Sequence, residues 1–131
     1  MARRKIISDQ SVHSEVRRLL AEGGDKAVSF ASVARATGLA GPTLVQRFGS
    51  REAMLKAALT AAWDDLAAET AAAEALAPLT PKGAQAFLKS LGADAPESAD
   101  LSLLAADFRD PDLRGRAEAW RAQVEQALAI R

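Results

Sequence analysis

The chain has 131 residues, of which 49% are hydrophobic and 5% aromatic, and its formal net charge at pH 7 is zero. This length suffices for one modest domain, or for one small and one incomplete domain, with a real hydrophobic core. The lack of cysteine excludes disulfides, thiolate catalysis and cysteine-ligated zinc, and abundant alanine with few aromatic residues favours an all-α fold.

The zero net charge conceals an asymmetry along the chain. Through residue 60 there are ten Lys or Arg against five Asp or Glu, whereas residues 61–131 have seven against twelve. The basic first half is suited to a polyanion such as DNA, although a solvated charged face would give the same excess. The start "MARRKIISDQS" lacks the apolar stretch of a signal peptide, and no run of eighteen apolar residues follows. We therefore expect a cytoplasmic protein with no membrane contact.

The first half predicts three helices in succession. The first spans residues 9–22, with one apolar face, and ends at Gly23 and Gly24. Ser29 is suited to cap a second helix over 30–37, which Gly38 ends. Pro42 fits the first turn of a third helix over 42–48.

The second half predicts further helices from capping residues and prolines. Ser50 is expected to cap an alanine-rich helix that runs to about Ala77 and stops before Pro78. The pairs Thr80-Pro81 and Asp110-Pro111 each place a capping oxygen before a proline at the first helical position. The predicted spans are 81–91, 97–107 and 111–130.

Two short helices joined by "GLAG" have the layout of a helix-turn-helix, whose second helix enters the major groove of DNA. Val33, Leu39, Leu44 and Phe48 are predicted to point inward. The remaining side chains of the second helix include glutamine and arginine, which form paired hydrogen bonds with base edges, and threonine, which contacts a phosphate or a thymine methyl group.

The segment "SFASVARATGLAGPTLVQRFGSREAMLKAAL" resembles the DNA-binding region of the tetracycline-repressor (TetR) family. The resemblance rests on Val33-Ala34, Thr37-Gly38-Leu39-Ala40, Pro42-Thr43-Leu44-Val45, Phe48 and Ser50-Arg51-Glu52, and with the first helix it covers about residues 9–60. It implies an operator-binding regulator that responds to an effector, expected to be a repressor.

The resemblance also implies roles for individual residues. Thr43, Gln46 and Arg47 fall on the recognition helix, and Arg51, where lysine is usual, is expected to hold a backbone phosphate. Val45 replaces a tyrosine that commonly binds phosphate, which removes a hydroxyl donor. The predicted DNA-binding residues are Ser29, Gly41, Pro42, Thr43, Gln46, Arg47 and Arg51.

Residues 1–50 are thus expected to form the DNA-binding domain and 51–131 a regulatory and dimerisation domain that shares its first helix with it. Beyond residue 60 the resemblance is looser; in the family this region binds a small effector and dimerises through the last two helices. The chain stops before those two, so it is incomplete, dimerises differently, or is a short member. The candidate lining of an apolar effector pocket is Trp63, Phe87, Leu91, Leu104, Phe108 and Trp120, residues that ordinary core packing explains equally well.

Two other classes of function compete with this interpretation. For an enzyme, the neighbours Asp64 and Asp65 point about 100° apart on a helix and His13 lies at the edge of an apolar face, so we expect no catalysis, metal or cofactor. For a protein-interaction module, the final helix has apolar residues in steps of four and three, a spacing that packing within its own domain also produces. This stripe consists of Leu113, Ala117, Trp120, Val124 and Ala127.

Overall fold

The computed structural model describes residues 7–92 and 110–131. These two parts contain six α-helices, one short 3₁₀ helix and no strand. The all-α prediction is therefore confirmed. The helix predicted over 97–107 lies outside the described residues.

The chain divides into two compact units, which we call unit 1 (Met1–Ala61) and unit 2 (Ala62–Arg131). The long helix α4 (Arg51–Leu76) begins in unit 1 and ends in unit 2. The net charge of unit 1 is +5 and that of unit 2 is −5, because the excess of basic residues ends where unit 1 ends.

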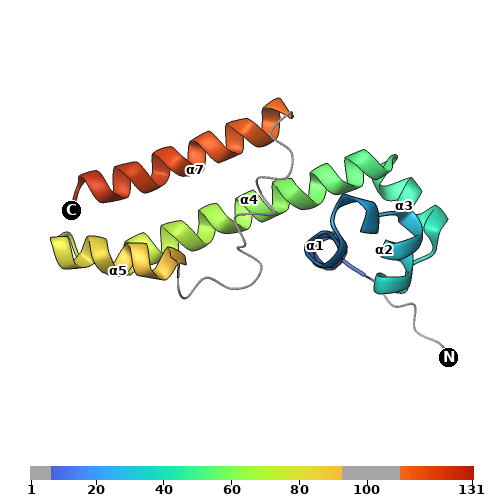
Figure 1. Ribbon diagram of the computed structural model, residues 1–131, viewed down its shortest axis with the longest axis horizontal. Helices are drawn as coiled ribbons and strands as arrows, with labels where there is room; N and C mark the ends of the chain where they lie inside the picture. Colours follow the sequence, from blue (N-terminus) through green and yellow to red (C-terminus); the bar gives the residue numbers. More distant parts are fainter. Residues whose placement is uncertain (1–6, 93–109) are drawn as a thin grey trace. The chain divides into compact units, whose positions relative to one another are not determined.

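Unit 1 consists of α1 (Asp9–Gly23), the 3₁₀ helix η1 (Asp25–Ala27), α2 (Phe30–Thr37), α3 (Gly41–Phe48) and the first turns of α4. Figure 1 shows the three short helices gathered at the beginning of α4. Their apolar faces form one core, which explains why such short helices persist, since isolated helices of this length are marginal in water. Among residues 7–61 of unit 1, the buried apolar ones are Val12, Val16, Leu20, Val28, Val33, Leu44, Met54, Ala58 and Leu59.

The predicted helix ends of unit 1 agree with the structure to within about one residue. Ser29 caps α2, and Gly38 ends it with φ 77°, a left-handed conformation that glycine adopts without steric cost. The helix α3 begins at Gly41, one residue before the predicted start, with Pro42 in its first turn. The Ser50 hydroxyl accepts the Ala53 N–H at 3.1 Å, which confirms the predicted cap of α4.

Unit 2 contains the rest of α4, α5 (Pro81–Gly92) and α7 (Pro111–Ala129). The Thr80 hydroxyl accepts the Gly83 N–H at 3.0 Å, and the Asp110 carboxylate accepts two N–H groups of the first turn of α7. Both predicted caps are thus confirmed. Gly83 allows a close approach, because a Cβ there would overlap the Pro78 carbonyl group.

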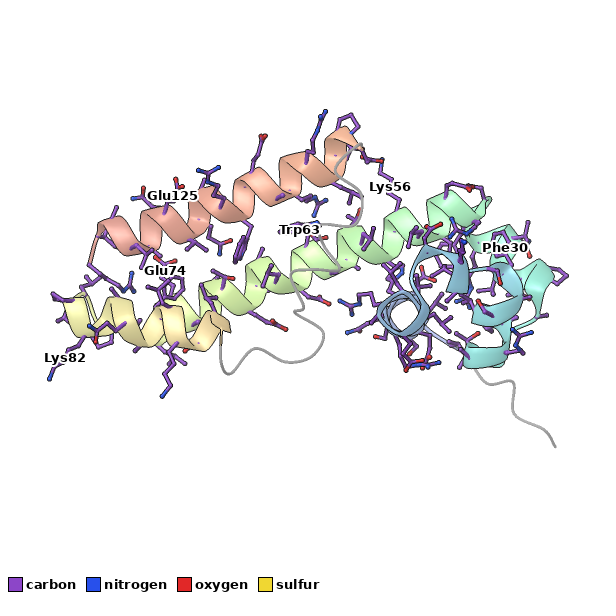
Figure 2. All side chains as sticks on the ribbon, in the orientation of Figure 1. Phe30, Lys56, Trp63, Glu74, Lys82 and Glu125 are labelled. Carbon is purple, nitrogen blue, oxygen red and sulfur yellow. The ribbon has the colours of Figure 1, made fainter. Side chains whose placement is uncertain are left out.

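The helix α7 packs along the later part of α4 (Figure 1). The Trp120 indole N–H donates to the Thr70 hydroxyl at 2.9 Å, and the Gln123 amide donates to the Ala67 carbonyl at 3.0 Å. Trp63 lies on the side of α4 toward α7 (Figure 2), with its ring centroid 6.3 Å from that of Trp120. The two helices are therefore joined by both polar and aromatic contacts.

The apolar stripe of α7 turns toward its own unit. Leu113 and Ala127 are buried, while Ala117, Trp120 and Val124 are half-buried. In the structure this stripe therefore packs within its own domain, which was one of its two interpretations. Among the residues that the structure describes, the exposed large apolar side chains lie elsewhere, at Val45, Leu76, Leu79, Leu88 and Ile130.

Candidate nucleic-acid interface

The turn between α2 and α3 is fixed by local hydrogen bonds. The Gly38 N–H donates to the Ala34 carbonyl at 2.9 Å, and the Thr37 hydroxyl accepts the Leu39 N–H at 3.2 Å. Residues 38–40 therefore connect the helices tightly, and α3 follows at once. This is a helix-turn-helix, in which the second helix is the one suited to a DNA groove.

One side of α3 is anchored in the core of unit 1. Leu44 is completely buried, as is Val33 on α2. Phe48, one turn after Leu44, is half-buried, and its ring centroid lies 6.0 Å from that of His13 on α1. Leu39 is also half-buried. The predicted inward side chains thus hold α3 against both α1 and α2.

The other side of α3 presents polar side chains. Thr43, Gln46 and Arg47 are spaced i, i+3 and i+4, which places them on one face of the helix. Gln46 and Arg47 are exposed and Thr43 is half-buried. At the leading end of the helix, Pro42 is exposed and Gly41 is half-buried. Five of the seven predicted DNA-binding residues therefore lie together on this short helix.

Arg47 has a contact with α1 that the sequence did not indicate. Its Nη1 donates to the Ile7 carbonyl at 2.7 Å and lies 3.3 Å from Asp9 Oδ1. The Nε and Nη2 groups take no part in these bonds. Since a bidentate contact with guanine needs two donors on one edge of the guanidinium, the edge formed by Nε and Nη2, which neither of these bonds uses, is the one suited to a base.

The two other predicted residues, Ser29 and Arg51, lie at the starts of α2 and α4. The Ser29 hydroxyl accepts the Ser32 N–H at 3.0 Å, while the Ser29 N–H donates to the Ser32 hydroxyl at 2.9 Å. Arg51 donates to the Val28 carbonyl, immediately before Ser29. Ser29 and Arg51 therefore lie close together. In the described part of the chain, no hydrogen bond or ion pair joins either of them to the polar side chains of α3.

Val45, which stands where the family commonly has a phosphate-binding tyrosine, is a further candidate for a contact with DNA. Its side chain is 45% exposed, on a helix whose neighbouring residue Leu44 is buried. An exposed apolar group on a recognition helix is suited to contact the methyl group of thymine. The sequence could have indicated that Val45 is exposed, because Val45 directly follows Leu44, which was predicted to point inward.

The predicted effector residues divide into two places. Trp63 and Trp120 face each other between α4 and α7, whereas Phe87 on α5 is buried with the Arg131 guanidinium 5.8 Å from its ring centroid. No ring contact joins Phe87 to either tryptophan among the described residues. Leu91 is half-buried. Leu104 and Phe108 lie outside the described residues.

The acidic pair considered for catalysis takes part in surface contacts. Asp64 forms an ion pair with Arg116 of α7, and Asp65 is exposed. Within residues 7–92 and 110–131, no group of three or more His, Asp or Glu side chains is arranged to hold a metal ion. None of the helices described is both long enough and apolar enough to cross a membrane.

The fold and the exposed face of α3 define a helix-turn-helix DNA-binding domain. Residues 15–58 match the family model for bacterial regulatory proteins of the tetR family. Residues 15–58 are therefore similar to the DNA-binding domain of tetR-family regulators. The matched residues run from α1 into the first turns of α4 and include all of α2 and α3. Comparison of the chain with curated proteins and with solved structures gave no significant match.

Proposed function

We propose that the chain is an effector-responsive repressor that occupies an operator through α3 and thereby excludes the transcription machinery. The observation that carries this proposal is the two-sided character of α3. Leu44 anchors the helix in the core, while Gln46 is exposed and Arg47, whose side chain is 30% exposed, lies beside the start of α1. The net charge of +5 on unit 1 adds attraction to the phosphate backbone that does not depend on sequence.

Each exposed group of α3 has a matching partner in the major groove. Gln46 is suited to the N6 and N7 atoms of adenine, and Arg47 to the O6 and N7 atoms of guanine. Thr43 can donate to a phosphate or contact a thymine methyl group, and Val45 can contact such a methyl group. Gly41 and Pro42 form the leading end of the helix, where small residues permit close approach to the backbone of DNA.

Regulation is proposed to lie in unit 2. Trp63, which is buried, and Trp120, which is half-buried, are proposed to contact a small apolar effector. Two copies of the chain are proposed to bind together, because one recognition helix covers only a few base pairs. In dimeric helix-turn-helix proteins, the two recognition helices lie about 34–36 Å apart on one face of the duplex.

Selection of bound fragments from a random DNA pool tests this function. The purified chain is expected to enrich a palindrome, whose symmetry would reflect a dimer, and binding to it should weaken steeply as the salt concentration rises. A pool that stays random after repeated rounds would contradict sequence-specific binding. Enrichment of a single asymmetric half-site would retain the operator-binding proposal but contradict the dimer.

Alanine substitutions at Gln46 and Arg47 test the base contacts. Each loss of a base-contacting side chain should cost about 1–3 kcal/mol on the selected site and relax specificity at one base pair. The measurement is a titration of each variant against duplexes that carry every substitution at each position. Gln85→Ala on α5 and Arg121→Ala on α7 remove the same side chains from unit 2 and should leave the profile unchanged. Identical profiles for the parent, Gln46→Ala and Arg47→Ala would remove both residues from base recognition.

A further inference from the structure

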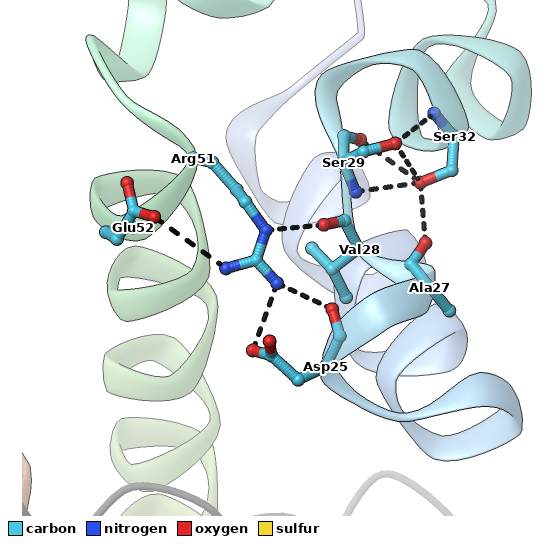
Figure 3. Close-up of polar contacts among 7 residues, drawn as sticks. All are labelled: Asp25, Ala27, Val28, Ser29, Ser32, Arg51 and Glu52. Carbon is cyan, nitrogen blue, oxygen red and sulfur yellow. Dashed lines mark hydrogen bonds and ion pairs between the residues drawn. The ribbon is translucent and has the colours of Figure 1, made fainter.

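Arg51 stands at the first position of α4, but its side chain points back to the segment before α2 (Figure 3). The Nε–H donates to the Val28 carbonyl at 2.6 Å, and Nη2 donates to the Asp25 carbonyl at 2.5 Å. The same Nη2 lies 3.0 Å from a carboxylate oxygen of Asp25. The guanidinium thus has acceptors on two residues that precede it by more than twenty positions.

The charge of Arg51 is also balanced within the protein. Besides Asp25, the Glu52 carboxylate lies 3.9 Å from Nη1 (Figure 3). Two carboxylates within 4.0 Å surround one guanidinium, so the net charge of this group of three side chains is negative. A DNA phosphate approaching Arg51 would meet both acidic side chains, which weakens the attraction that a phosphate contact requires.

The carbonyl that Arg51 holds belongs to the residue before the cap of α2. Ser29 and Ser32 form a reciprocal capping box, and the Ser32 hydroxyl also donates to the Ala27 carbonyl at 2.7 Å. Val28 is 1% exposed, so its position is fixed by the core as well. Arg51 is therefore bonded to a rigid point at the start of α2.

The hydrogen bonds of Arg51 join the two ends of a segment of chain that contains the whole helix-turn-helix. Residues 28 and 51 lie 23 positions apart, and α2, the turn and α3 all fall between them. Holding both ends of a segment restricts the conformations open to the helices within it. A change at Arg51 therefore affects how α3 is held without touching a side chain of α3.

We propose that Arg51 is a positioning residue, which fixes the orientation of the α2–α3 segment for DNA by joining the starts of α2 and α4, and that it is not a phosphate ligand. The proposal rests on the proposed operator binding. It also explains why arginine suits this position, since a planar guanidinium serves acceptors on Val28 and Asp25 together, whereas an ammonium group is a single point of charge.

Binding of the selected operator by Arg51→Ala and Arg51→Lys tests this role. Both variants should lose about tenfold in affinity, the effect of one or two weakened hydrogen bonds, while the slope of log affinity against log salt concentration stays that of the parent. Asp25→Asn keeps the backbone acceptor and should bind nearly as the parent does. Thermal melting of each variant would establish that it is folded at the temperature of the titration.

A slope reduced by about one in Arg51→Ala, with affinity restored by Arg51→Lys, would overturn the proposal in favour of a phosphate contact. A lowered melting temperature with unchanged affinity would overturn it in favour of a purely stabilising role. Backbone amide chemical shifts of DNA-free Arg51→Lys give a readout independent of operator binding. Changes that extend into α2 and α3 are expected, whereas changes confined to residues next to 51 would contradict the inference even if the parent bound no operator.

Discussion

Leu44→Ala is expected to destabilise unit 1 by about 2–5 kcal/mol and to abolish operator binding at temperatures where the parent is folded. Leu44 is completely buried, and its removal leaves a cavity in the core of unit 1. The helix α3 has eight residues, too few to persist without this packing. Because the unit is small, such a loss is a large part of its total stability.

The loss of stability in unit 1 can be measured separately from the stability of unit 2, because of where the tryptophans lie. Both tryptophans, Trp63 and Trp120, belong to unit 2, so their fluorescence reports on that unit, whereas the amide signals of α2 and α3 report on unit 1. Urea titration should show a lower midpoint for the amide signals of Leu44→Ala. Val45→Ala, one residue further along, removes a 45% exposed side chain and should shift this midpoint very little. Equal midpoints for Leu44→Ala and the parent would show that α3 is not held as the structure describes.

Arg131→Ala is expected to destabilise unit 2 by about 3 kcal/mol. The Arg131 side chain is 2% exposed. Its guanidinium donates to the carbonyls of Ala127 at 2.7 Å, Glu74 at 2.8 Å and Ala77 at 2.9 Å. It thus satisfies carbonyls at the ends of both α4 and α7, where the carbonyls of a helix's last turn have no N–H donors within the helix. Its removal takes this partly buried donor from all three carbonyls, of which the Glu74 carbonyl keeps the bond from the Ala77 N–H at 3.1 Å.

Tryptophan fluorescence during urea unfolding measures this loss directly, because both indoles lie in unit 2. Arg131→Lys should recover little, since one ammonium group cannot reach all three carbonyls in the arrangement that the guanidinium has. Arg121→Ala is the matched control on α7, where the side chain is 79% exposed and pairs with Glu125 one turn away. It should change stability by less than about 0.5 kcal/mol. A similar midpoint for Arg131→Ala and Arg121→Ala would contradict the structural role of Arg131.

The helix boundaries were predictable because their causes are local. Ser29, Ser50, Thr80 and Asp110 each accept N–H groups within three residues, and a hydroxyl or carboxylate before a helical pattern indicates this by itself. The left-handed Gly38 is likewise a property of one residue in its own turn. The exposed face of α3 followed from the same local spacing.

The partners of the long charged side chains were not predictable in this way. Arg47 contacts residues 38 and 40 positions before it, and Arg131 contacts residues more than fifty positions away. A family pattern assigns these positions to DNA or leaves them unassigned, because it records residue types and not the carbonyls that folding brings near. The sequence also did not determine what packs against Trp120. Apolar residues on α7 have the same spacing whether they pack against α4 or against a second chain.

Chemical modification of single bases in the selected operator tests most directly whether α3 binds in the major groove. Replacing guanine or adenine by its 7-deaza analogue removes the N7 acceptor from the major groove, while replacing guanine by inosine removes the amino group from the minor groove. If α3 binds in the major groove, 7-deaza substitution at one or two positions in each half-site should weaken binding by about 1–3 kcal/mol, and this penalty should disappear in Gln46→Ala or Arg47→Ala. Binding that tolerates every 7-deaza substitution but fails with inosine would contradict recognition of the major groove by α3.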